Sequence, residues 1–472
     1  MAKHYIPYEL NQLLLLPPDM RSWLPEKHLA LFVMDVVGSL DLSPFYEKRS
    51  GKDLRGRAGY HPQMLVTLLV YAYCVGKPSS RKIERATYEE VAFRVLSGDR
   101  HPDHDTISTF RKEHIKELSG LFTQVLLLCR EAGLVKLGHV AIDGTKIKAN
   151  ASKHKAMSYE RLCEAELRIT QEVERLLAEA ELIDAQEDTR YGKGKLGDEL
   201  PAELSRHESR LAKIREAKES LESQAKAAAE AKASEAQAKL KERAKKEDET
   251  GKKPRGKPPA VPNPEEAKPD PKAQRNFTDP ESRIMPDGAN KGSFIQGYNA
   301  QIAVDGEAQI IVAAELTQET NDKRQLVPMS EKVIENMGRL ADTLSADAGY
   351  FSEAAVGSEV LAGTLLLVPW ARPKHRAQAD KSGEAETSRI SEAKVSMRER
   401  LQSEEGKALY KMRKAIVEPV FGQVKSVRGF DRFSLRGVDN ARGEWLLITA
   451  THNLLKLFRY GTSFPIRAAA TY

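Results

Sequence analysis

The chain has 472 residues, which is long enough for two or three domains that bury a sizeable core. Its three scattered cysteines exclude a disulfide framework and a zinc cluster and favour the reducing cytoplasm, and no apolar run approaches the roughly 20 residues of a membrane span. The net charge of +6 favours an acidic polymer as partner, and residues 410–460, with ten Lys or Arg against four Asp or Glu, account for all of it.

The first 135 residues have the pattern of an all-helical domain. Pro62 opens an apolar run that is typical of a buried helix, and a later helix should end at Gly98. Asp105 is a candidate N-cap for a long helical segment, either one helix or two divided at Gly120. Basic side chains on these helices fit a helix in a DNA groove, or equally a packing domain with a solvated basic face: Arg81, Lys82, Arg85, Arg111 and Lys112.

Strand patterns begin at Val140. An alternating apolar run reaches Asp143 at the predicted end of a strand, and the chain is expected to turn back through Gly144 into TKIKANAS. An Asp-Gly pair is also an ordinary hairpin turn, so a purely structural role for Asp143 stays open.

A long insertion follows, over residues 153–275. Apolar residues spaced by three and four predict an antiparallel, coiled-coil-like helical hairpin with a break at 191–197: Ile169, Val173, Leu176, Ala180, Ile183, then Leu204, Leu211, Ile214 and Leu221. From Ala225 the segment is rich in Ala, Lys and Glu, and residues 252–272 are rich in Pro and Lys, which predicts an exposed or disordered linker. We expect the insertion to lie away from the chemistry.

The pattern after residue 276 alternates strands and helices. GYNAQIAVDG and AQIIVAAEL predict a hairpin around Asp305, and a helix over 322–338 leads to a strand that ends near Asp347. A helix near 352–361 and the apolar strand TLLLVPW come next. This succession predicts a mixed sheet covered by helices, with ligands expected at the strand ends, where Asp347 falls.

Three acids on separate elements are candidate metal ligands: Asp143, Asp347 and Glu418. Carboxylates hold hard divalent cations, and two such ions about 4 Å apart can activate a nucleophile and stabilise the leaving oxygen in phosphodiester cleavage. Each acid also has a structural alternative. Asp347 can cap a turn near Gly349, and Glu418 can be an ordinary exposed helix charge.

The basic C-terminal region supplies candidate DNA contacts. Its cationic side chains are denser than solubility requires, which favours phosphate contacts from Lys425, Arg428, Arg432 and Arg436. Trp445 is a candidate for base stacking, but it lies in an apolar helix where core packing is equally expected. His139 and His452 lack partners at metal-ligand spacing, so we expect structural roles for both.

Several of these segments, in this order, resemble the DDE transposases of bacterial insertion sequences. The likeness rests on HDTISTFR, DGTKIKANAS, GYNAQIAVD, DAGYFS, RGFDRFSLRG and EWLLITATHNLLKL, and on a series formed by Tyr410, Arg413 or Lys414, Glu418 and Lys425. It covers most of the chain except the insertion. The usual three-residue spacing before the Glu is met by Lys414 and not by Arg413. Both are predicted DNA contacts, but which of them takes the arginine's place stays open. Pro419 is expected to start or kink a helix at Glu418.

The resemblance implies a ribonuclease H-like α/β core with a mixed sheet flanked by helices. The expected organisation is an all-α N-terminal domain for DNA binding or assembly (1–135), a first part of the core (136–152), the helical insertion (153–275) and the rest of the core (276–472). It also implies that Asp143, Asp347 and Glu418 bind Mg²⁺, with Mn²⁺ able to substitute and two ions expected. Tyr410 and Lys425 would contact the DNA backbone beside Glu418.

The implied reaction is nicking of double-stranded DNA at a transposon end, after which the freed 3′-hydroxyl attacks target DNA. We expect a homodimer on DNA in the bacterial cytoplasm, associated with the nucleoid, with no membrane and no small-molecule substrate. Two other classes stay open. One is a metal-dependent ribonuclease H-like nuclease or resolvase that does not join strands, and the other is a noncatalytic DNA-binding scaffold.

Overall fold

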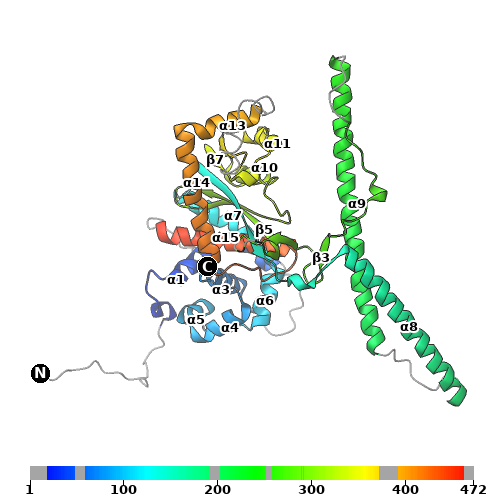
Figure 1. Cartoon of the computed structure of the whole chain (residues 1–472). Coiled ribbons are helices and arrows are strands. Elements are labelled where there is room, and N and C mark those ends of the chain that lie inside the picture. The colour runs from blue at the N-terminus through cyan, green and yellow to red at the C-terminus, as the bar shows by residue number, and fades with distance from the viewer. Residues whose placement is uncertain are drawn as a thin grey trace, which may run out of the picture. The chain divides into compact units, whose positions relative to one another are not determined.

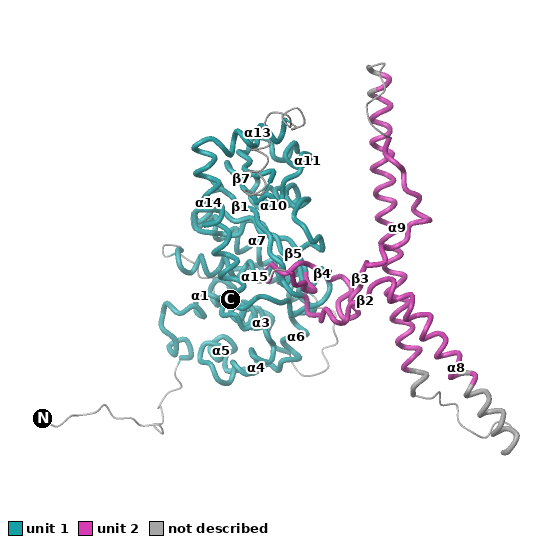
Figure 2. The backbone as a smooth tube through the Cα atoms, in the orientation of Figure 1, with its two compact units in different colours: residues 1–148, 298–472 teal, residues 149–297 magenta. Residues whose placement is uncertain are grey.

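The computed structural model describes residues 19–47, 59–191, 202–250, 258–288, 290, 292–371 and 392–461. The chain forms two compact units, which Figure 2 distinguishes by colour. Unit 1 comprises residues 1–148 and 298–472, and unit 2 comprises residues 149–297. The inserted segment therefore divides the sequence of unit 1 directly after its first strand. Within the described ranges, no helix is long and apolar enough to cross a membrane.

Short helices form the first part of unit 1, as the sequence predicts. They are η1 Met20–Trp23, α1 Leu29–Ser39, α2 Ser43–Glu47, α3 Pro62–Cys74, α4 Ser80–Glu89, α5 Val91–Ser97, α6 His104–Glu113 and α7 Ile115–Glu131. Pro62 occupies the first position of α3, and nearly every residue of this helix is buried. Gly98 ends α5 in the left-handed conformation, with φ 58°. The predictions for these two helices are confirmed.

The segment after residue 103 forms two helices, but with other boundaries than predicted. Asp103, and not Asp105, caps α6, because its side chain accepts a 2.6 Å hydrogen bond from the Thr106 amide. The break falls at His114, and Gly120 lies inside α7. The His114 ring packs against Phe45 and Phe110, with centroids 5.5 and 4.6 Å apart. This tertiary packing accompanies the break and leaves no signal in the residue spacing.

A mixed sheet lies at the centre of unit 1. Its strands are β1 His139–Lys148, β5 Phe294–Asp305 from Tyr298 onwards, β6 Ile311–Thr317, β7 Thr343–Ser345 and β8 Leu365–Leu367. They lie in the order β6-β5-β1-β7-β8. β1, β7 and β8 are parallel, and β5 and β6 are antiparallel. The amide of Gly306, after β5, donates to the His139 carbonyl at the start of β1 (2.9 Å), so these strands are also antiparallel.

This strand order is that of a ribonuclease H-like core. Among the strands of unit 1, β5 and β6 lie on one side of β1, and β7 and β8 lie on the other. The predicted fold class is confirmed. Asp305 ends β5, and its carboxylate accepts hydrogen bonds from the amides of Leu137 (2.7 Å) and Glu307 (3.0 Å). The predicted hairpin around Asp305 is therefore present, and the Asp305 carboxylate stabilises its turn through these hydrogen bonds.

Helices and short turns complete unit 1 (Figure 1). They are α10 Leu326–Met337, η4 Ala348–Tyr350, α11 Glu353–Val356, η5 Glu359–Leu361, α13 Glu392–Gln402, α14 Glu404–Gly422, the π-helical turn η7 Gln423–Val427 and α15 Val438–Tyr460. α10 packs on β6, and α14 packs on β1. α15 packs against both β6 and α7. The helix that follows the sheet therefore also contacts the N-terminal helices.

A buried polar network also joins the N-terminal helices to the core. The Tyr73 hydroxyl of α3 donates to Glu444 of α15 at 2.8 Å, and Arg111 of α6 donates to the Tyr73 hydroxyl at 3.3 Å. The predicted N-terminal domain, residues 1–135, thus packs with the core in one unit. Arg111 is buried and also donates to the Pro78 carbonyl, so its suggested place on a DNA-groove helix is wrong. Other basic candidates in this region are exposed: Arg81, Lys82, Arg85 and Lys112.

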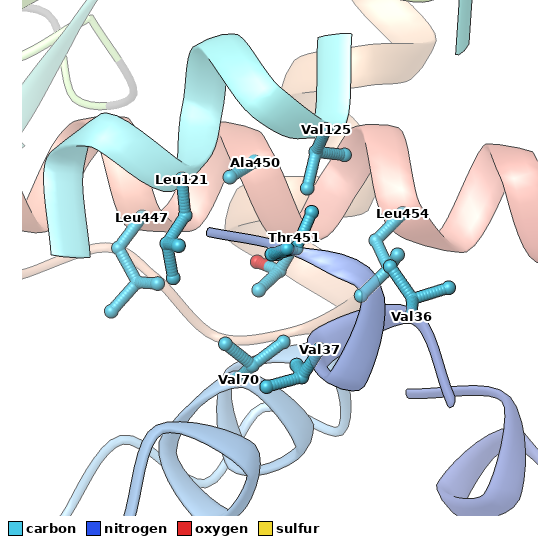
Figure 3. A pocket seen from close by; sticks show the side chains of 10 residues that line it. Val36, Val37, Val70, Leu121, Val125, Leu447, Ala450, Thr451 and Leu454 are labelled. Atoms are coloured by element: carbon cyan, nitrogen blue, oxygen red, sulfur yellow. The ribbon is translucent and has the colours of Figure 1, made fainter. Parts of the chain in front are cut away.

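A small apolar cavity remains between α1, α3, α7 and α15 (Figure 3). It is lined by Val36, Val37, Leu40, Val70, Leu121, Val125, Leu447, Ala450, Thr451 and Leu454. Its volume of about 10 Å³ is roughly that of one water molecule. The hydroxyl of Thr451 already donates to the Ile448 carbonyl at 2.8 Å. The cavity is therefore a packing gap and not a ligand site.

Unit 2 contains the predicted helical hairpin, α8 Tyr159–Tyr191 and α9 Ala202–Thr250. Its core is formed by Leu162, Ala165, Ile169, Leu211, Ile214, Ala217 and Leu221. The hairpin prediction is confirmed for the stripe residues in this core, whereas the side chains of Ala180, Ile183 and Leu204 lie outside the described residues. The unit also holds η2 Lys153–Lys155, β2 Ala156–Ser158, η3 Pro264–Glu266, β3 Gln274–Asn276 and β4 Arg283–Pro286. β2 pairs with β3, and β4 pairs with the first residues of β5.

The segment from Ala225 is largely exposed, as predicted, but its first part is helical. α9 continues to Thr250, and η3 of the Pro/Lys-rich segment packs against it. Small residues at a spacing of three or four are buried there: Ala229, Ala233 and Ala236. Lys226 and Glu265 form an ion pair across this contact (2.6 Å). The described part of the predicted linker, residues 258–272, is nevertheless mostly exposed, as predicted, while residues 251–257 lie outside the described residues.

Candidate active site

Asp143 lies inside β1 and not at a turn. The strand continues through Gly144 to Lys148, so the predicted return at Gly144 is wrong. The glycine has another cause. A Cβ at residue 144 would lie 2.9 Å from the Asp322 carboxylate and closer still to the Gln301 amide nitrogen. Glycine therefore lets these two side chains pack directly against the backbone beside Asp143.

Asp347 follows the strand next to Asp143. The register pairs His139 with Thr343 and Ala141 with Ser345 in parallel β1 and β7. Asp143 lies two residues beyond the last of these pairs within β1, and Asp347 lies two residues beyond the end of β7, where its charge acts on Asp143. Asp347 also accepts a 2.8 Å hydrogen bond from the Gly349 amide and caps η4. The turn-capping alternative is thus correct, and it fixes the carboxylate at this strand end.

Two carboxylates, those of Asp143 and Asp347, interact with the buried guanidinium of Arg413. The Asp143 carboxylate accepts hydrogen bonds from Arg413 (3.1 Å) and from the Gly144 amide (2.8 Å). Burial nevertheless raises the pKa of Asp143 to about 6, and the charge of Asp347 adds to the rise. A hard divalent cation prefers carboxylate oxygens and would supply additional positive charge. The residues present here therefore fit the predicted metal ion.

α14 extends along β1 on both sides of Glu418. Arg413 reaches Asp143, and its guanidinium lies 5.9 Å from the centre of the Tyr410 ring. Beyond Glu418, the Lys425 ammonium donates to the Thr145 hydroxyl and the Lys146 carbonyl, both at 3.1 Å. Burial raises the pKa of Tyr410, and the charges of the two aspartates contribute to this shift. The Tyr, Arg and Lys of the predicted series thus lie around the acid pair.

Glu418 itself is exposed on α14. It lies one turn after Lys414 and two turns after Tyr410, on the same flank of the helix. Among the described residues, no three His, Cys, Asp or Glu side chains are grouped closely enough to hold a metal ion. The structure therefore brings together two of the three predicted acids and leaves the third on the adjacent helix.

Pro419 does not start the helix, so that part of the expectation is wrong. It lies inside α14, which is followed directly by the π-helical turn. A proline has no amide hydrogen for the carbonyl four residues earlier, which is that of Ala415. The side chain of Gln309 replaces this donor, because its Nε2 donates to the Ala415 carbonyl at 2.9 Å. A contact from the β5–β6 hairpin thus satisfies the carbonyl that Pro419 leaves without a helical donor.

Several predicted DNA contacts require correction. Arg428 is buried and donates to the Thr451 hydroxyl (2.8 Å) and the Ile448 carbonyl (3.2 Å), so it cannot contact a phosphate. Trp445 is fully buried, and its indole donates to the Gln301 carbonyl (3.2 Å), so the core-packing alternative is correct. Arg413 is also buried and faces Asp143. The exposed members of the predicted set are Lys414, Arg432 and Arg436.

The two histidines have structural partners, as predicted. His139 pairs through Nε2 with the Ser345 hydroxyl at 2.8 Å, and His452 pairs with the Gln309 carbonyl at 3.0 Å. Burial lowers the pKa of His452 to about 3, so this side chain is neutral.

Sequence reasoning missed a polar cluster next to β1. It consists of Lys146, Asn299, Gln301, Asp322 and Tyr350, which come from β1, β5, the segment before α10, and η4. Asp322 is its acid and accepts 2.7 Å hydrogen bonds from both Asn299 and Gln301. A polar residue at alternate positions of a buried strand, as at Asn299 and Gln301 within GYNAQIAVD, is the only signal in the sequence.

This arrangement defines a class of protein: a ribonuclease H-like core with an acid pair at the centre of its sheet and a basic helix beside it. Comparison with known families agrees. Residues 261–454 match the model of the transposase DDE domain, and residues 18–113 match a second model described as a transposase domain. The chain therefore belongs to the DDE-type transposases of insertion sequences. No curated protein and no solved structure matches it. The first match includes Asp347 and Glu418 but begins at residue 261, near the end of the insertion, so Asp143 lies outside it.

Proposed function

We propose that this transposase binds the terminal inverted repeats of its element, cuts the DNA there and joins the freed end to target DNA. The observation that carries the proposal is the acid pair: Asp143 lies in β1, and Asp347 lies just beyond the end of the parallel neighbour β7. Membership of the family already implies that the protein acts on DNA and that it is an enzyme of the nuclease or transposase class. The proposal adds the substrate sequence, the joining step and the residues.

Asp143, Asp347 and Glu418 would hold two Mg²⁺ or Mn²⁺ ions. When bound, such ions supply a nucleophilic oxygen at neutral pH and stabilise the leaving oxygen of the phosphodiester. Asp143 is half-buried beside Asp347; burial raises its pKa to about 6, and the charge of Asp347 adds to the rise. Glu418 is exposed on α14, the helix that packs on β1, and would join the two aspartates as the third ligand.

The remaining residues of α14 have separable roles. Arg413 orients Asp143 through its 3.1 Å ion pair and does not contact DNA. Lys425 is held at Thr145 and Lys146, and with Tyr410 it would contact the DNA backbone next to the cut. Exposed Lys414, Arg432 and Arg436 would bind phosphates farther along the duplex. We expect a homodimer to bring two ends together.

The test uses purified protein, Mg²⁺ or Mn²⁺ and DNA that carries the sequences on both sides of its own gene. We expect cuts at matching inverted repeats and covalent joining of the cut ends to a supercoiled plasmid. Asp143→Asn should lose cutting and keep DNA binding. Glu331→Gln, which removes an exposed carboxylate of α10, is a matched control that should keep cutting. Cutting without joining would favour a nuclease, and undiminished cutting by Asp143→Asn would refute the assigned acids.

A further inference from the structure

A buried glutamine lies directly beneath the strand that carries Asp143. Successive residues of β1 point to opposite faces of the sheet, so Gly144 and Lys146 face away from the side chain of Asp143. Gln301 of β5 fills the space over Gly144, where a Cβ would clash with its amide nitrogen. The Gln301 side chain is fully buried. Its amide must therefore find all its hydrogen-bond partners inside the protein.

These partners connect Asp143's strand to the turn that carries Asp347. The Gln301 oxygen accepts a hydrogen bond from the Tyr350 hydroxyl, and its nitrogen donates to the Asp322 carboxylate (2.7 Å) and the Asn299 oxygen (3.0 Å). Tyr350 is fully buried and is the last residue of η4, the turn that Asp347 caps. One amide thus ties the position of η4 to the backbone at Gly144.

Asp322 links the same amide to a cation near the acids. Its Oδ1 accepts from Asn299 and from Gln301, and it lies 3.5 Å from the ammonium of Lys146. Lys146 is three residues beyond Asp143, and its side chain is only 16% exposed. Burial lowers the pKa of Lys146, while the charges of Asp322, Asp143 and Asp347 act in the opposite direction. The members of the cluster are therefore hydrogen-bonded to one another, and Lys146 couples the cluster electrostatically to the acid pair.

We propose that Gln301, Tyr350 and Asp322 are positioning residues that set the separation of the Asp143 and Asp347 carboxylates for metal binding. The inference rests on the proposed function, because it needs these two aspartates to be metal ligands. Metal ligands must be held close to their productive geometry, and the groups behind them provide that constraint. None of the three positioning residues needs to touch the metal or the DNA.

Tyr350→Phe tests the proposal because it removes only the hydroxyl that η4 offers to Gln301. The measurement is Mn²⁺ binding to the full-length protein by titration calorimetry, alongside wild type and Asp143→Asn. We expect Mn²⁺ affinity to fall about 10-fold, as is common when a group behind a metal ligand is lost. Tyr73→Phe is the matched control. It removes a buried tyrosine hydroxyl that donates to Glu444, so it should cost stability and leave Mn²⁺ affinity unchanged.

The outcomes separate this inference from the proposed function. If Asp143→Asn loses Mn²⁺ binding while Tyr350→Phe retains wild-type affinity, the positioning role is wrong and the acid site stands. If Asp143→Asn binds Mn²⁺ as wild type does, both are wrong. Asp322→Asn is the second variant should Tyr350→Phe fail to fold. It keeps the size of the side chain, and an Mn²⁺ affinity equal to that of wild type would likewise overturn the role.

Discussion

Gln309→Ala should destabilise unit 1 by an amount that depends on the residue at position 419. Gln309 joins the β5–β6 hairpin to two helices. Its Nε2 donates to the Ala415 carbonyl of α14, and its Oε1 accepts from Lys456 of α15 at 2.8 Å. The first bond should contribute about 1 kcal/mol, and the second, from a charged and buried donor, about 1.5 kcal/mol. The expected loss in the free energy of unfolding is therefore about 2.5 kcal/mol.

Pro419→Ala supplies the control because it returns the amide hydrogen that the Ala415 carbonyl lacks. In that background Gln309→Ala should cost only the Lys456 bond, about 1.5 kcal/mol. Urea unfolding of wild type, both single variants and the double variant gives the coupling between the two positions, for which we expect about 1 kcal/mol. A coupling of zero would show that Gln309 does not replace the missing helical donor.

Three further predictions concern the charged groups. Because the folded-state pKa of Asp143, about 6, exceeds its ordinary 3.8, the metal-free protein loses stability as pH rises between these values. When the pH is raised from 4 to 7, the free energy of unfolding of Asp143→Asn, measured in urea, should therefore increase by on the order of 3 kcal/mol relative to that of wild type. If the difference between the two proteins is the same at both pH values, the pKa shift is contradicted. Arg432→Ala should reduce the salt dependence of DNA binding. Arg428→Ala should lower the unfolding midpoint and leave the salt dependence of DNA binding unchanged, because Arg428 is buried. The reverse pattern would exclude our assignment. Glu444→Gln should lower the free energy of unfolding in urea by about 3 kcal/mol. It removes the negative charge that faces Arg111, from the side chain that accepts the Tyr73 hydrogen bond. A loss below about 1 kcal/mol would show that the network is dispensable.

The sequence predicts the order and type of the main elements because their signals are local. Apolar alternation marks β1 and β5, and spacing by three and four marks the α8–α9 hairpin. The two aspartates can also be predicted from the sequence, because Asp143 lies within an apolar strand and Asp347 follows one. Their proximity cannot, because the register of β1 against β7 depends on the whole sheet.

The errors arise where a distant contact overrides a local rule. Gly144 has the pattern of a turn residue, yet Gln301 and Asp322 require it within a straight strand. Pro419 should interrupt a helix, but Gln309 supplies the missing donor. Arg428 belongs to a basic run and is nevertheless buried over the Phe430 ring, 5.2 Å from its centre. In each case the deciding partner is far away in the chain, and residue spacing carries no information about it.

The central claim is that three carboxylates from β1, the end of β7 and α14 converge on metal ions. The most direct measurement is a crystal structure of the protein with Mn²⁺ and DNA of its own element's end, with manganese located by its anomalous scattering. We predict anomalous peaks about 2.1 Å from carboxylate oxygens of Asp143, Asp347 and Glu418, with Glu418 turned towards β1. Manganese bound elsewhere, or bound to the aspartates with Glu418 still directed into solvent, would contradict the account.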